Sequence, residues 1–190
     1  MLAIIFLLQG NAYAKSSLIQ PAPMSLTPGL ILIATDDVVD EDFSQTVIML
    51  THYSADGAVG VILNKPIYDS HIPLNYYDYD NKILSMLNYV GDGGPVYKLK
   101  WSALIYTGKI LQQDLIAAKL YYIADLQLSA GLKDIPRDAL VNLYNGIVSW
   151  GKGQLEYEIE RNIWFPLKQN YNVLFYISPE HLRDHLVRKK

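Results

Sequence analysis

The sequence contains no cysteine among its 190 residues. This absence excludes disulfide bonds, zinc sites with cysteine ligands, iron–sulfur clusters and any thiol nucleophile. It does not select a compartment, because a cysteine-free chain suits the cytoplasm and the periplasm alike. Stability and any chemistry must therefore come from the other side chains.

Charged residues are also scarce, at 18% of the chain, whereas hydrophobic residues make up 51%. Such a composition is typical of a packed globular protein and excludes a disordered one. The formal net charge is −3, which gives no broad electrostatic attraction to nucleic acid. The length suits one domain with a sizeable core and is short for two.

Hydrophobic runs of membrane-spanning length are missing as well. The apolar run at residues 2–8 is too short to cross a bilayer as a helix, and no stretch after residue 14 predicts a span. Residues 12–14, Ala-Tyr-Ala, resemble the small-x-small pattern before a signal-peptide cleavage site, but no Lys or Arg precedes the apolar run. We therefore interpret residues 1–25 as a signal-like or extended segment and residues 26–190 as one domain.

Hydrophobic periodicity predicts a series of strands with a few helices between them. An Asp-Gly turn at residues 54–57 predicts an antiparallel hairpin, whose near-continuous hydrophobicity indicates a central position with cover on both faces. One helix is expected to begin at Asp134, ahead of Pro136, and another after Ser178, whose hydroxyl would cap it. A polar loop or lid is expected at 69–81. The pattern predicts strands at 29–34, 46–53, 58–64, 102–107, 120–124, 147–150 and 173–177, and helices at 83–87 and 154–162.

Residues 146–152 nearly match the phosphate-binding loop of nucleotide hydrolases. The next position is Gly153, where that pattern needs the hydroxyl of Ser or Thr to hold magnesium. Glu156, Glu158 and Glu160 suit the start of a helix but would repel a triphosphate placed there. A tight turn between a strand and a helix explains these glycines better than a nucleotide site.

Other candidate sites are equally incomplete. His181 and His185 share a helix face, but the glutamate of a metalloprotease motif is missing between them. The acidic run at residues 36–42 could bind a cation, yet a solvated turn is the favoured interpretation. No serine lies in a Gly-x-Ser-x-Gly turn. The residues therefore predict no catalytic group, no metal and no cofactor.

Four segments carry a more specific pattern and span most of residues 26–177. Together, in this order, they resemble the AlgH-type (YqgE-like) family of bacterial proteins. The segments are the strand at 29–34 followed by Asp42-Phe43, the Gly-Ala-x-Gly-x-x-x-Asn-x-Pro run at 57–66, Gly93-Gly94-Pro95-Val96, and Trp150-Gly151-x-Gly153-Gln154-Leu155-Glu156-x-Glu158 with Trp164. The chain departs from the family at Thr35-Asp36 and at residues 147–149. It also departs at Tyr106, a position where the family commonly has a histidine.

The resemblance implies an α/β (α+β) fold, a single domain with a mixed, largely antiparallel sheet flanked by helices. It also implies a cytoplasmic protein, or a periplasmic one if residues 1–14 are a cleaved signal. Family members are often described as transcriptional regulators, without an established catalytic mechanism. The chain has no helix-turn-helix pattern and no basic recognition helix. We therefore expect a regulatory or binding domain without catalysis, which contacts an unknown protein or small molecule.

Eight residues of the shared segments form the candidate cleft or structural motif. The structural interpretation is that the glycines permit chain reversals while the polar side chains satisfy backbone groups. The alternative is an uncharacterised enzyme with a cleft near Asn64, Gly94, Gln154 and Glu156, in which Glu156 or Asp36 acts as acid and base. A third hypothesis is an exported structural or interaction protein. The eight residues are Asn64, Gly93, Gly94, Pro95, Trp150, Gly153, Gln154 and Glu156.

Overall fold

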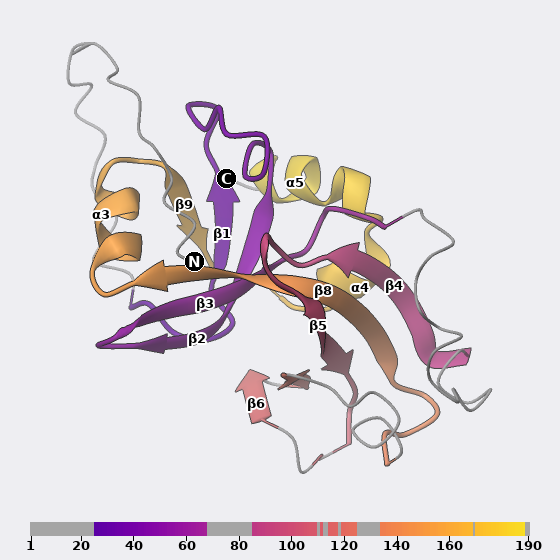
Figure 1. Cartoon of the computed structure of the whole chain (residues 1–190). Helices are drawn as coiled ribbons and strands as arrows, with labels where there is room; N and C mark the ends of the chain where they lie inside the picture. Colours follow the sequence, from indigo (N-terminus) through magenta and orange to yellow (C-terminus); the bar gives the residue numbers. More distant parts are fainter. Residues whose placement is uncertain are drawn as a thin grey trace.

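The structure is a computed structural model, and it describes residues 25–67, 85–109, 111, 114–117, 119–124, 134–168 and 170–188. The signal-like segment expected at 1–25 and the loop or lid expected at 69–81 lie outside these residues, apart from residue 25. The described chain is built around one sheet, with short helices against its faces (Figure 1).

Nine strands form the sheet in the order β6-β7-β5-β8-β3-β2-β1-β9, and β4 pairs with β8 beside this path. The pairings between these strands, within the described ranges, are antiparallel except that of β4 with β8. The strands are β1 (Ile31–Ala34), β2 (Val47–Ser54), β3 (Gly57–Ile62), β4 (Leu87–Asp92), β5 (Val96–Tyr106), β6 (Asp114–Ala117), β7 (Leu120–Ile123), β8 (Leu140–Gly151) and β9 (Trp164–Leu167).

The long strand β8 joins the two halves of the sheet. Its residues 140–147 pair with β5, and residues 141–145 pair with β4. Its last four residues, 148–151, pair with β3, so β8 continues from one half into the other (Figure 1). The expected strand at 147–150 is thus the end of a strand of 12 residues.

β1 and the first half of β2 are buried on both faces, as their sequence predicts, whereas the second half of β2 is half-buried or exposed. Alternate residues of β1 enter different clusters because successive side chains of a strand point to opposite faces. Leu32 and Ala34 belong to one cluster, and Ile31 and Ile33 belong to the other. The predicted β2–β3 hairpin, the turn at 54–57 and the central position are all confirmed.

Each of these two clusters is completed by helices on its own face. Helix α3 (Gln154–Glu160) packs Leu155 into the first cluster. Helices α4 (Val173–Tyr176) and α5 (Pro179–Val187) bring Leu174 and Leu182 into the second. Figure 1 shows α3 apart from the adjacent pair α4 and α5.

Three expected elements differ from the structure. The helix expected from Asp134 is wrong, because only turns precede Leu140, which begins β8. The strand expected at 173–177 is wrong, because residues Val173–Tyr176 form α4. Leu87, placed at the end of a short helix, begins β4. In each case packing between distant segments overrides a local preference.

The fold class is confirmed in part. A single domain with a mixed, largely antiparallel sheet and flanking helices is present. The α/β label fits less well, because strands dominate the described residues and the one parallel pairing among them is that of β4 with β8.

Candidate functional site

A buried carboxylate occupies the junction between β8, α3 and β9. Only 3% of Glu158 is exposed. Its Oε2 accepts hydrogen bonds from the indole Nε1 of Trp150 at 2.8 Å and of Trp164 at 2.6 Å. Its Oε1 accepts a third from Gln154 Nε2 at 2.9 Å. Three donors therefore compensate for the burial of the charge.

The glycine turn before α3 positions these groups. Gly153 has φ +72° in the left-handed region and precedes the helix. Gly151 N donates to Gln154 Oε1 at 3.0 Å, so both ends of that amide are bound within the chain. The rings of Trp150 and Trp164 meet edge to face, with centroids 6.0 Å apart. The geometry thus matches the structural interpretation of this segment.

Glu156 points to a different partner from Glu158. The hydroxyl of Tyr53, on β2, donates a hydrogen bond to Glu156 Oε1. This bond, together with burial and the nearby negative charge, raises the pKa of Tyr53 above its usual value. The contact links the β2–β3 hairpin to α3.

Asn64 and the Gly93–Pro95 segment lie at other turns. Asn64 Oδ1 accepts from Val47 N at 2.8 Å, and its Nδ2 donates to the carbonyl of Gln45 at 2.9 Å. The segment Gly93–Pro95 connects β4 to β5. At Gly94, with φ +142°, a Cβ atom would lie 2.4 Å from the backbone of Ile147. Only glycine fits such an approach.

The eight candidate residues are thus distributed over three turns. Trp150, Gly153, Gln154 and Glu156 surround the start of α3, whereas Asn64 holds the start of β2. Neither of the hollows described below is lined by any of the eight. The structure therefore brings half of them together and assigns each group a role in holding a turn.

The remaining sequence candidates are placed as follows. Ser178 precedes α5 as expected, but its hydroxyl pairs with His181 Nδ1 at 2.8 Å, and no side-chain bond to the backbone caps the helix. Asp36 accepts a hydrogen bond from Arg183 at 2.8 Å, which ties α5 to the end of β1. Within the described residues, no group of three or more His, Asp or Glu is arranged to hold a metal ion. No helix among the same residues has the length and hydrophobicity to cross a membrane.

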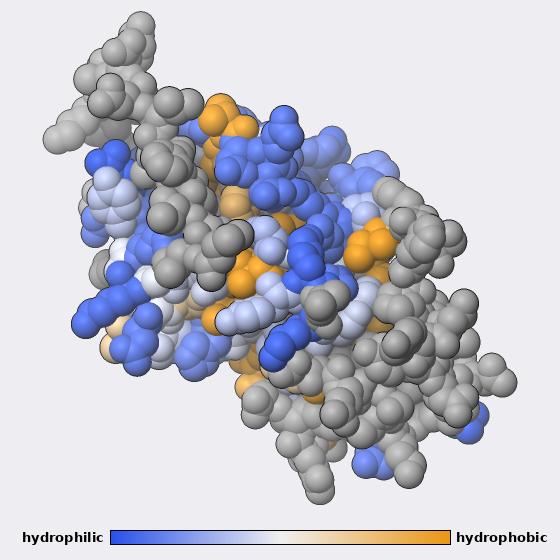
Figure 2. Space-filling view, viewed as in Figure 1, coloured by the Kyte–Doolittle hydropathy of each residue, from blue (hydrophilic) through white to orange (hydrophobic). Residues whose placement is uncertain are grey.

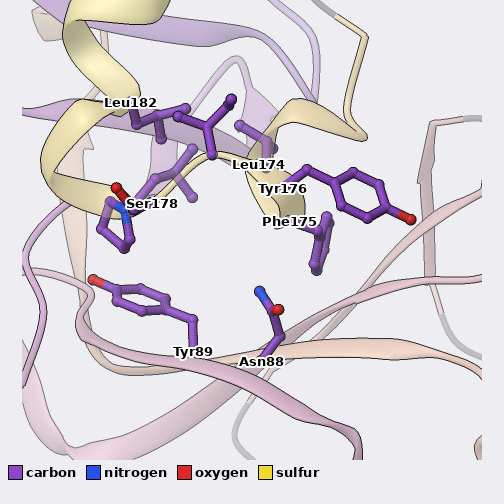
Figure 3. A pocket seen from close by; sticks show the side chains of 10 residues that line it. Asn88, Tyr89, Leu174, Phe175, Tyr176, Ser178 and Leu182 are labelled. Atoms are coloured by element: carbon purple, nitrogen blue, oxygen red, sulfur yellow. The ribbon is translucent and has the colours of Figure 1, made fainter.

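A groove that the sequence did not indicate runs between β4 and the α4–α5 segment. It consists of two adjoining hollows of about 310 and 340 Å³, which share Asn88, Tyr89 and Pro179. Figure 3 shows the first hollow, with Asn88 and Tyr89 on one side and the α4–α5 residues on the other. Figure 2 shows hydrophobic surface in the region where α5 and β4 face each other. The first hollow is lined by Leu63, Asn88, Tyr89, Leu174, Phe175, Tyr176, Ile177, Ser178, Pro179 and Leu182.

A buried amide holds the polar group of this groove in place. Asn88 Nδ2 donates to Asn142 Oδ1 at 3.0 Å. Asn142, which is 1% exposed, donates in turn to the carbonyl of Leu174 in α4 at 3.2 Å and to the hydroxyl of Tyr144 at 3.4 Å. Burial raises the pKa of Tyr144 far above its usual value, so this hydroxyl stays protonated at neutral pH. The Asn88 side chain is therefore fixed from beneath while it faces the groove.

The fold and these turns define a class of single-domain proteins with a curled, largely antiparallel sheet and short flanking helices. The solution structure of the AlgH protein from Pseudomonas aeruginosa has this fold, with a TM-score of 0.65, 24% identity and coverage of 90% of this chain and 92% of that one. A protein from Corynebacterium diphtheriae, DIP2367, matches with a TM-score of 0.75, 19% identity and 90% coverage of both chains.

Similarity in sequence identifies the family to which the chain belongs. The pattern of the family described as AlgH-like matches residues 31–190. A UPF0301 protein of Methylobacterium sp. (strain 4-46) is 31% identical over 176 residues, covering 84% of this chain and 81% of the relative. One from Chlamydia abortus is 30% identical over 162 residues, covering 83% and 82%. The chain belongs to the AlgH-like family, as its sequence segments predict.

Two features were missed by the sequence reasoning. Glu158 belongs to the family pattern at residues 150–158, but the pattern alone does not predict that it is buried and holds two indoles. Its position four residues after Gln154 and three after Leu155 is a usable signal, because that spacing places it on the buried face of the helix. The groove had no comparable signal, because its walls come from segments about 85 residues apart.

Proposed function

We propose that this chain is a regulatory or binding domain that holds a partner in the groove between β4 and α4–α5 and carries out no catalysis. The observation that supports this most is the composition of the groove, with aromatic and aliphatic walls around one anchored amide, Asn88. Hollows that combine apolar walls with polar groups in fixed positions are typical of binding sites. The transcriptional role ascribed to AlgH-type proteins would then operate through a bound protein or small ligand.

An enzyme at the sequence candidates has less support. Asn64 and Gln154 use both ends of their amides in bonds to neighbouring turns, and Glu156 accepts from Tyr53. Side chains engaged in this way stabilise local structure, whereas an acid–base pair needs a group directed at a substrate. The bonding of these residues therefore favours binding without turnover.

Titration of the ¹⁵N-labelled chain with a set of small neutral fragments tests this function. We expect saturable amide shifts concentrated at residues 87–90 and 174–182, with every fragment recovered unchanged. The substitution Tyr176→Ala removes an exposed wall of the groove and should weaken binding. The control Tyr157→Ala, on α3, should not. Saturable binding only near α3, or conversion of a fragment into product, would contradict the proposal.

A further inference from the structure

Among the described residues, the ten that line the first hollow include no Lys, Arg, His, Asp or Glu. A charged group that entered it would lose hydration without gaining a counter-charge, which is costly. The leucine side chains of Leu63, Leu174 and Leu182 instead offer contact to an apolar group. The portion of a partner that enters this hollow is therefore uncharged, with apolar atoms that contact these leucines.

The second hollow extends this requirement. Among the described residues, Pro66, Ile67, Leu87 and Val90 line it with apolar surface, and Glu180 is the charged one. The two hollows lie on either side of the residues that they share, Asn88, Tyr89 and Pro179. Each hollow thus suits one of two apolar groups of the same partner.

Asn88 is one of these shared residues, and it offers a hydrogen bond between the two hollows. One of its amide hydrogens is used by Asn142. Within the described residues its Oδ1 accepts no hydrogen bond. A carboxamide oxygen accepts up to two hydrogen bonds. The matching group on a partner is an N–H donor that lies between two apolar side chains.

We propose that the partner is a protein segment that places two neighbouring apolar side chains in the two hollows and directs the peptide N–H between them at Asn88 Oδ1. This inference rests on the proposed binding function and gives its partner a chemical class. A peptide unit supplies the required donor without charge, and its two flanking side chains supply the apolar groups. The peptide carbonyl can meet the second amide hydrogen of Asn88 or water.

The probe is N-acetyl-leucyl-leucine amide, which is neutral and has the proposed arrangement. With the ¹⁵N-labelled chain, we expect saturable shifts at residues 87–90 and 174–182 at probe concentrations on the order of 1–10 mM. N-acetyl-glutamyl-glutamate amide, with two acidic side chains, should bind at least about tenfold more weakly. The substitution Asn88→Leu keeps a similar shape and removes the amide, so binding of the neutral probe should weaken about threefold to tenfold.

A second variant keeps the test decisive if Asn88→Leu does not fold, since that change leaves Asn142 Oδ1 without its donor. Tyr176→Ala removes only a wall of the first hollow and should weaken the neutral probe, while Tyr157→Ala leaves it unchanged. Equal binding of the neutral and acidic probes, or no saturation at the groove, would overturn the inference. If simple fragments bind the groove and the dipeptide does not, the inference fails while the proposed binding function stands.

Discussion

Replacing Glu158 tests the interpretation of the tryptophan-and-glycine junction. Glu158→Ala leaves the indole N–H groups of Trp150 and Trp164 without acceptors in a buried site. Each unsatisfied buried donor costs about 1–3 kcal/mol, so the pair costs about 2–6 kcal/mol. Removing a buried charge relieves a desolvation cost and offsets part of this loss. We therefore expect the free energy of unfolding to fall by about 2–4 kcal/mol.

The conservative variant separates charge from geometry. Glu158→Gln retains one oxygen that can accept from both indoles but turns an N–H toward the Gln154 amide. If Gln154 rotates to accept this N–H, the backbone N–H of Gly151 loses its acceptor. Two N–H groups then face each other in either arrangement, and at least one lacks an acceptor, so the expected loss is about 1–2 kcal/mol, smaller than for alanine.

Urea unfolding followed by tryptophan fluorescence measures these changes, because two of the reporting indoles contact the altered side chain. For a slope of about 2 kcal/mol per molar urea, Glu158→Ala should lower the midpoint by about 1–2 M. The control is Glu160→Ala, two residues along α3 and exposed, which should change stability by less than about 0.5 kcal/mol. If Glu158→Ala unfolds with the same free energy as Glu160→Ala, the buried carboxylate does not hold the junction.

Three further predictions concern other parts of the molecule. Gly94→Ala forces a Cβ atom against Ile147 and should cost more than about 3 kcal/mol, whereas Gly108→Ala, with open space around it, should change the thermal midpoint little. Asn64→Ala removes the acceptor of the first N–H of β2 and should cost about 1–3 kcal/mol by chemical denaturation, and a wild-type midpoint would contradict its role. The pKa of Tyr144 is raised by burial, so its contribution to stability is complete below about pH 10 and is lost as the pH rises further. The free energy of unfolding of Tyr144→Phe should therefore fall less steeply than that of the wild type between about pH 10 and 12. An identical dependence of this free energy on pH in both proteins would refute the prediction.

The local sequence was sufficient to predict an element where its hydrophobic pattern agrees with the tertiary environment. The run at residues 29–34 predicts β1 because it is apolar and buried on both faces, and the Asp-Gly turn predicts the β2–β3 hairpin because it joins two largely apolar runs. Leu155 and Ile159 likewise predict the buried face of α3. The family segments follow the same logic, since most of them lie at these strands and turns.

The secondary-structure predictions were wrong where contacts with segments distant in the sequence determine the structure. Asp134 and Pro136 form a good helix start, but Val141 and Leu143 alternate toward a core and pair with β5 and β4, which requires a strand. The apolar run 173–177 fits a buried strand equally well by composition. These residues form a helical turn because Leu174 and Phe175 pack against one face of the sheet. The groove could not be predicted, because no local pattern reports which surfaces of β4 and α5 will face each other.

The position of β8 in the chain constrains the order of assembly on the ribosome. This strand supplies the pairing edge for β3, β4 and β5, yet it begins only at Leu140. The hairpin and β5 are therefore synthesised well before the segment that covers their edges. At about 5–20 residues per second, the interval from residue 62 to residue 151 lasts several seconds to about 20 seconds. Nascent chains that stop before this strand keep apolar edges open, and chaperones that shield such edges should associate with them preferentially.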